Sequence, residues 1–244
     1  MSELASESAS TARAITDVAG AAWAALATVR DPELDAPVTD LGFVASCSVS
    51  PEGHASVRLR LPTYFCAPNF AYLMVADAYD AVRAVPGVRT AEVILTDHFA
   101  SDAINTGVAA RAGFVAAFDG EAVAELGDLR KSFLRKAVMA GTDQVCRPLL
   151  AAGTPPGELA DRTLGDVTPS PELGRLRQRR AELNLPAGDD APLVIDPETG
   201  EGVSGNSLPL HLRRARLTRA GIEANTGMCT GMLKHRYALQ EDHQ

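Results

Sequence analysis

The stretch that decides the fold lies at residues 61–69 and consists of Leu61-Pro62-Thr63-Tyr64-Phe65-Cys66-Ala67-Pro68-Asn69. An alternating strand leads into it and an amphipathic helix follows it, so Cys66 lies where strand becomes helix. Backbone amides point outward at the start of a helix and the helix dipole is positive there, which favours a thiolate. The alternative is that Cys66 is a small core residue, because free cysteine is among the most buried residue types.

Two strands precede this stretch and are predicted to form a hairpin. Apolar and polar residues alternate from His54 to Leu61, as in a strand with one solvated face. The inward face would carry Ala55, Val57, Leu59 and Leu61. The other strand is predicted from Phe43 to Val49, with a turn at residues 50–53. Cys47 shares the apolar phase of that strand, so we expect it to pack in the core.

Helices and a third strand complete the predicted domain. A helix from Thr11 carries an apolar stripe that includes Trp23, and it ends at Asp31-Pro32 because the residue before proline avoids helical geometry. The helix after Cys66 extends to about Val85, and a strand follows at residues 89–96. The sequence therefore predicts an α+β fold, with a compact helix–strand–strand–helix–strand domain and a mainly helical C-terminal extension.

This element order predicts which side chains come together. A helix joins the second and third strands, so the two run parallel and end at the same edge of the sheet. Three segments should meet at that edge: the acidic loop from Asp31 to Asp40, residues 63–66, and residues 96–98. Binding sites are expected at such strand ends. Asp31 and Asp40 could instead cap the loop, and His98 could be a hydrogen-bonded strand-end histidine.

Several short motifs then suggest a family. They are Asp31-Pro32-Glu33-Leu34, Val38-Thr39-Asp40-Leu41-Gly42-Phe43-Val44, Thr63-Tyr64-Phe65-Cys66 and Pro86-Gly87-Val88. In this order they resemble the PaaD/SufT-like iron–sulfur cluster assembly family (metal–sulfur cluster biosynthetic proteins), over about residues 14–115. Two features depart from the family pattern. The proline expected after the cysteine is displaced to Pro68, and residues 97–99 (Asp-His-Phe) replace a Pro-Pro-Trp-like segment.

The resemblance implies a maturation or delivery factor rather than an enzyme. Cys66 would hold iron or an iron–sulfur cluster transiently, because thiolate is a soft metal ligand and one cysteine cannot complete a cluster that needs four ligands. The supporting residues would be Asp31, Glu33, Asp40, Thr63, Asp97 and His98. The implied partners are a client apo-metalloprotein, the assembly machinery and a second copy of the chain, and a multicomponent non-haem iron oxygenase is one such client. A thiol-dependent enzyme is a weaker alternative, since it would need His98 as the base beside Cys66.

The remainder of the chain is predicted to form three segments. Residues 1–10 would be a disordered leader, residues 11–152 the assembly-like domain with added helices, and residues 153–244 a basic, partly helical extension. Four arginines in the extension are candidates for binding an acidic partner or the chain's own first domain: Arg213, Arg214, Arg216 and Arg219. They favour an alternative function as a non-catalytic adaptor. The same arginine pattern would also occur on a helix face that is merely exposed to solvent. Cys229 with His235 and His211 is a further possible metal site, but the spacing matches no strong pattern.

Composition limits the function classes. The net charge of -8 argues against a nucleic-acid binder. Four scattered cysteines indicate neither a zinc motif nor a disulfide framework, and they fit a reducing cytoplasm. The N-terminus lacks the pattern of a signal peptide, and the near-apolar run from Val18 to Val29 is shorter than the ~20 residues that span a bilayer. We therefore expect a cytoplasmic protein with neither nucleic-acid nor membrane partners.

Overall fold

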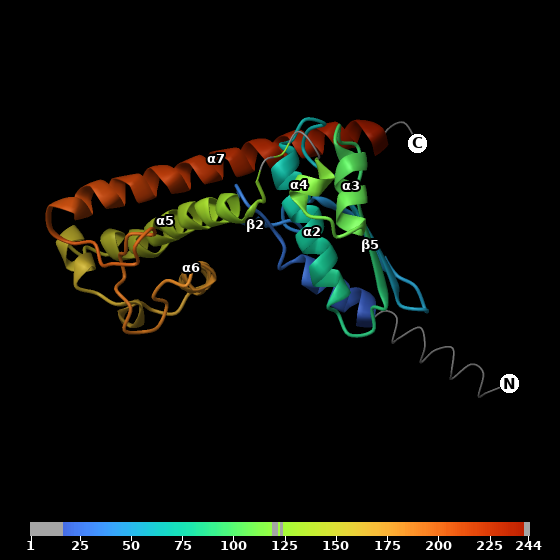
Figure 1. Cartoon of the computed structure of the whole chain (residues 1–244). Coiled ribbons are helices and arrows are strands. Elements are labelled where there is room, and N and C mark those ends of the chain that lie inside the picture. Colours follow the sequence, from blue (N-terminus) through green and yellow to red (C-terminus); the bar gives the residue numbers. More distant parts are fainter. Residues whose placement is uncertain (1–16, 119–121, 123, 242–244) are drawn as a thin grey trace. The chain divides into compact units, whose positions relative to one another are not determined.

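The computed structural model describes residues 17–118, 122 and 124–241, and the chain forms two compact units (Figure 1). The first unit comprises residues 1–126 and 226–244, and the second comprises residues 127–225. This division differs from the predicted segments 11–152 and 153–244. The helix before residue 153 packs in the second unit, and the last part of the chain packs in the first. The predicted leader at residues 1–10 lies outside the described residues.

A three-stranded sheet with the order β3-β4-β5 forms the centre of the first unit. β3 (Val44–Val49) and β4 (His54–Leu59) are antiparallel, whereas β5 (Thr90–Leu95) is parallel to β4. The predicted α+β class, the hairpin and the parallel third strand are confirmed. The register of β3 shifts between Val44 and Ser46. Ala45, at this bulge, is exposed, and Cys47 is half-buried and packs against the core.

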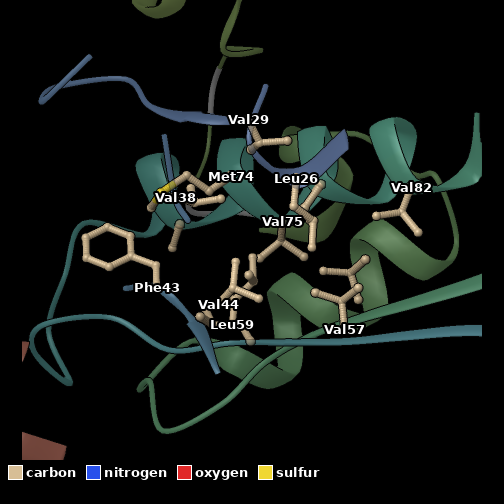
Figure 2. Packing of buried hydrophobic residues seen from close by; sticks show 14 of the residues in the cluster. Leu26, Val29, Val38, Phe43, Val44, Val57, Leu59, Met74, Val75 and Val82 are labelled. Atoms are coloured by element: carbon tan, nitrogen blue, oxygen red, sulfur yellow. The ribbon is translucent and has the colours of Figure 1, made fainter. Parts of the chain in front are cut away.

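Helices cover the sheet and close the first core. They are a helix described over residues 17–26, α2 (Pro68–Arg83), α3 (Ser101–Ala109) and the short α4 (Phe114–Ala117). Figure 2 shows Leu26, Val57, Val75 and Val82 packed together in this core. Ala22, Leu26 and Val29 point inward as the helical period predicts, but Trp23 is 46% exposed. The buried stripe of this helix is therefore narrower than the sequence suggested.

The second unit is built on α5 (Gly127–Ala151) and α6 (Pro171–Glu182), with the short helices η1 (Pro156–Ala160), η2 (Leu164–Asp166) and η3 (Gly205–Ser207). α5 is continuous through Pro148. Cys146 is buried in this core. Arg180 is buried as well, and it donates hydrogen bonds to the carbonyls of Pro192 (2.8 Å) and Leu193 (2.6 Å).

The last helix, α7 (Leu208–Glu241), has 34 residues, and its end belongs to the first unit. Leu233 and Tyr237 are buried in the core that holds the sheet. Gly42, at φ +75°, lies against Leu233, and a Cβ there would approach the leucine to 3.3 Å. Within the part of the chain that the structure describes, no helix has the length and apolar character needed to cross a membrane.

Candidate functional site

The loop that carries Cys66 lies directly after β4, as predicted. Leu61 is buried, and the chain then turns outward, so Cys66 is half-buried. Thr63 Oγ1 lies 3.3 Å from Cys66 Sγ and also accepts a hydrogen bond of 3.2 Å from the amide of Phe65. Ala67 has extended geometry, as expected before a proline, and Pro68 begins α2. Thr63 therefore shapes the loop and contacts the thiol.

His98 fixes this loop from the end of β5. Its Nε2 donates a 2.7 Å hydrogen bond to the carbonyl of Cys66, and its Nδ1 accepts one of 3.2 Å from the amide of Ala100. A carbonyl only accepts, so the proton is on Nε2. Burial lowers the pKa of His98, the hydrogen bond to Cys66 opposes this, and Arg236 adds to the lowering. The neutral ring therefore has no lone pair free for a metal or for the Cys66 proton.

Asp97 anchors the end of α7. It has a left-handed backbone with φ +54°, which aspartate tolerates better than most residues. Its carboxylate lies 2.5 Å from Arg236 Nη2 and accepts a 3.3 Å hydrogen bond from Tyr237. Arg236 also donates to the carbonyls of Asp97 (2.7 Å) and Leu61 (3.0 Å). Asp97, a predicted site residue, therefore links the end of β5 to α7.

The acidic loop has a defined structure, held by hydrogen bonds within the loop. It contains a short antiparallel pair, β1 (Arg30–Asp31) and β2 (Ala36–Pro37). The carboxylate of Asp31 is buried and accepts hydrogen bonds from the amides of Glu33 (2.9 Å) and Leu34 (2.8 Å). Burial raises the pKa of Asp31, and these two hydrogen bonds oppose the rise. Asp31 therefore caps the loop, which is the alternative that the sequence left open.

Asp40 differs from the other carboxylates of the acidic loop. Its side chain is exposed, and the hydroxyl of Thr39 donates to it at 3.3 Å. Of the predicted supporting residues, Thr63 and His98 contact Cys66, and Asp97 lies next to His98 in the chain. Among the described contacts, none joins Asp40 to Cys66 or His98.

An aromatic patch borders Cys66, and the sequence analysis did not identify it. It consists of Tyr64, Phe65 and Phe99, which are 45%, 77% and 49% exposed. The ring centroids of Tyr64 and Phe65 are 5.1 Å apart, and those of Phe65 and Phe99 are 6.0 Å apart. The amide of Phe99 donates to the carbonyl of Tyr64 at 3.1 Å, which ties the two loops together. The available signal was the position of aromatic residues directly beside Cys66 and His98.

The basic candidates on α7 separate into two kinds. Arg213, Arg214 and Arg216 are exposed. Arg219 instead binds within its own unit, where its Nε donates to Asp143 at 2.6 Å and its Nη1 pairs with Glu223. Arg219 thus contributes to the second unit, whereas the other three remain candidates for a partner surface.

Cys229 does not form the metal site that was considered with His235 and His211. No group of three or more histidine, cysteine or acidic side chains that could hold a metal ion occurs among the described residues. Cys229 instead packs, half-buried, against the core of the first unit, as Cys66 does. Burial raises the pKa of Cys229, and Asp31, Cys66 and Glu33 raise it further. Its electrostatic neighbours are therefore residues of the predicted site.

Two comparisons with known proteins gave a match, and the first of them covers this region. A family model described as "Iron-sulfur cluster assembly protein" matches residues 20–93, which include β3, β4, the Cys66 loop and α2. An uncharacterized protein of Methanocaldococcus jannaschii is 31% identical over 81 residues, which are 33% of this chain and 83% of that relative. The second unit lies outside the residues that the family model matches.

Proposed function

The chain belongs to the iron–sulfur cluster assembly protein family, and we propose that it assembles or delivers iron or an iron–sulfur cluster to a client metalloprotein through Cys66. A general role in iron–sulfur cluster assembly follows from the family. The ligand, the client and the transfer step are the proposed parts. The cluster or iron would be cargo and would be bound only transiently.

The observation that carries this proposal is the placement of Cys66. Its thiol is partly exposed, and its loop is held by the hydrogen bond from His98 to the Cys66 carbonyl and by that from Phe99 to Tyr64. A fixed backbone with an accessible soft ligand suits capture and release of iron. One thiolate leaves coordination positions for a recipient, because a cluster takes four protein ligands.

A carrier role is favoured over thiol-dependent catalysis. A catalytic cysteine needs an adjacent base that accepts its proton. His98 contacts the Cys66 loop, but its Nε2 donates to the Cys66 carbonyl and its Nδ1 already accepts the Ala100 amide. The His98 ring therefore positions the Cys66 loop through its hydrogen bonds. We accordingly propose a maturation factor and not an enzyme.

Anaerobic reconstitution tests the role of Cys66. Adding iron and sulfide to the purified chain should give a coloured species that Cys66→Ser removes. Cys47→Ser is the matched control, because Cys47 is also half-buried but lies in β3. In cells, Cys66→Ser should lower the iron content of the client. Unchanged client iron content and activity would contradict the proposal.

We propose that the client docks on the aromatic patch beside Cys66. Exposed aromatic side chains are frequent anchors of protein interfaces. Phe65→Ser should weaken binding of the apo form of a client, for which a multicomponent non-haem iron oxygenase is the candidate that the resemblance suggests. Titration calorimetry measures the change, expected at about 1 kcal/mol or more for an interface anchor. Trp23→Ser, at a separate exposed aromatic, is the control and should leave binding intact.

A second candidate function is that of an adaptor that binds a client through its basic helix. The exposed side chains of Arg213, Arg214 and Arg216 favour it. Truncation after Gly153 would also remove Leu233 from the first core, so charge reversal is the cleaner test. Changing the three arginines to glutamate should abolish client binding while iron loading persists. Arg175→Glu, at another exposed arginine of the second unit, is the control, and loss of iron loading instead would exclude the adaptor.

We place the protein in the cytoplasm, where it would meet the assembly machinery and its client. All four cysteines are free thiols, which suits a reducing compartment. A homodimer is a further proposed arrangement, because a second copy could supply the ligands that one Cys66 leaves open. Fluorescence microscopy of a tagged chain would check the location.

A further inference from the structure

The Cys66 loop is tied at two points to the segment that follows β5. The His98 ring donates to the carbonyl of Cys66 at 2.7 Å, and the amide of Phe99 donates to the carbonyl of Tyr64 at 3.1 Å. Both donors follow β5 in the chain, and both acceptors follow β4. The position of the thiol therefore depends on how the ends of these two strands are held relative to each other.

Arg236 joins the two chains beyond the point where the strand pairing stops. The last paired residues of the two parallel strands are Leu59 and Leu95. Two residues further along each chain, Arg236 donates to the carbonyl of Leu61 at 3.0 Å and to that of Asp97 at 2.7 Å. One guanidinium thus extends the connection between the strands to the position immediately before the loop that carries the thiol.

The Arg236 guanidinium is itself fixed in this position. Its Nη2 lies 2.5 Å from the carboxylate of Asp97, and the hydroxyl of Tyr237 donates to the same carboxylate at 3.3 Å. Burial of Leu233 and Tyr237 in the first core anchors the part of α7 that carries Arg236. A guanidinium presents several donors in one rigid plane, so a lysine at this position could not make the same set of contacts.

We propose that Arg236 is a positioning residue for Cys66. This inference rests on the proposed function and deepens it, because it assigns part of the cargo site to the end of α7, outside the residues that the family model matches. Arg236 acts through the backbone of Leu61 and Asp97 and not as a ligand. By joining the strand ends, it holds the thiol in place before the cargo arrives. A ligand that is already held loses less conformational freedom on binding, which raises its affinity.

Anaerobic titration of the full chain with Co²⁺ tests this role, because a thiolate bound to cobalt gives an absorption band. Arg236→Ala should raise the Co²⁺ concentration at half-saturation about tenfold, since residues that orient a metal ligand have effects of this size. Arg236→Lys should recover only part of this loss, because an ammonium group lacks the planar fork of a guanidinium. Lys234→Ala, at an exposed cation of the same helix, is the matched control and should leave the titration unchanged.

A second control separates positioning from stability. Val82 is buried near the end of α2, whereas Cys66 precedes the start of that helix. Val82→Ala should therefore destabilise the first unit and leave the Co²⁺ half-saturation unchanged. In Arg236→Ala, hydrogen exchange should become faster at the amides of Phe65 and Phe99, which are hydrogen-bonded within the two loops. Circular dichroism verifies that each variant is folded, and Arg236→Lys alone carries the comparison where Arg236→Ala is not.

The outcomes separate this inference from the function on which it rests. An unchanged half-saturation in the Arg236 variants, with a band that Cys66→Ser removes, would overturn the positioning role and leave the proposed function intact. An equal rise in Arg236→Ala and Val82→Ala would also overturn it, because the effect would then follow stability alone. A band that persists in Cys66→Ser, or no band in the unaltered chain, would contradict the proposed function and this inference together.

Discussion

His98 occupies both of its ring nitrogens with backbone atoms, and this determines what it can contribute to the site. The Cys66 carbonyl accepts from Nε2, and the Ala100 amide donates to Nδ1. The side chain is only 3% exposed. A histidine in this state positions the thiol and leaves cargo binding to sulfur.

Replacing His98 should reduce stability more than it reduces metal binding. In His98→Ala the buried Ala100 amide and the Cys66 carbonyl lose partners, which typically costs about 1–3 kcal/mol. His98→Gln keeps an N–H donor and should recover part of the loss. Chemical denaturation measures the unfolding free energy, and anaerobic reconstitution with iron and sulfide measures metal binding. Loss of the coloured species at unchanged stability would instead identify His98 as a ligand.

Single residues could be predicted where local pattern decides their position. Cys66 was placed at the strand-to-helix junction because the alternation before it and Pro68 after it are both local signals. His98 is the hydrogen-bonded strand-end histidine that the sequence allowed as an alternative, but its partners and those of Asp97 were not predictable, since they come from separate loops and from Arg236. The aromatic patch was missed for a related reason. Exposure depends on tertiary packing, which residue type alone does not give.

At the scale of elements, α7 has a different environment along its length. Residues up to Asn225 belong to the second unit, and those from Thr226 belong to the first. The buried residues of both parts lie on one face of the 34-residue helix, namely Leu208, Ala215, Leu233 and Tyr237, but polar residues such as Arg219 and Thr226 interrupt the apolar pattern of that face. Sequence periodicity therefore could not show that its end packs on the first core. By contrast, β4 and α2 each bury one face throughout, and their patterns predicted them well.

Leu233→Ala tests whether the end of α7 contributes to the stability of the first unit. Loss of a buried leucine typically costs about 2–5 kcal/mol. Leu217→Ala, at a leucine of the same helix that is 64% exposed, should cost less than about 0.5 kcal/mol. Hydrogen exchange of the β4 and β5 amides would localise the effect. Equal stability of the two variants would show that the segment is not part of the core.

At the scale of the whole molecule, two hydrophobic clusters support the two units. The first uses the sheet, and the second packs α5 and α6 around buried side chains such as Cys146 and Leu176. Composition at Gly153 suggested a boundary between them, but an exposed turn need not separate cores. The actual division depends on contacts far apart in sequence, which one sequence does not reveal.

The Cys146 thiol predicts how stability changes at alkaline pH. Burial raises its pKa from 9.0 to about 12, with Asp143 adding to the rise and Arg180 opposing it. Above pH 9 the unfolded chain therefore releases a proton that the folded chain keeps. The protonated Cys146 thiol therefore contributes fully to the unfolding free energy below pH 9. As the pH rises toward 12, the unfolding free energy falls by up to about 1.4 kcal/mol per pH unit.

Guanidinium unfolding at pH 7.5, 9 and 10.5, followed by circular dichroism, measures this decline. Cys146→Ala should flatten most of it. A smaller slope should remain, because burial also raises the pKa of Cys47 and Cys229. An identical slope in Cys146→Ala would assign the effect to other groups.

The packing of residues 226–241 in the first unit has a consequence for protein synthesis. Residues 127–225 leave the ribosome before them, so the nascent first unit must wait for Leu233 and Tyr237 while a separate unit is made. Contacts between such distant segments form slowly, because a long loop must close first. A chain interrupted in translation would carry Cys66 on a core that lacks Leu233 and Tyr237. The strand end before its Cys66 loop would also lack the hydrogen bond that Arg236 donates to the Leu61 carbonyl.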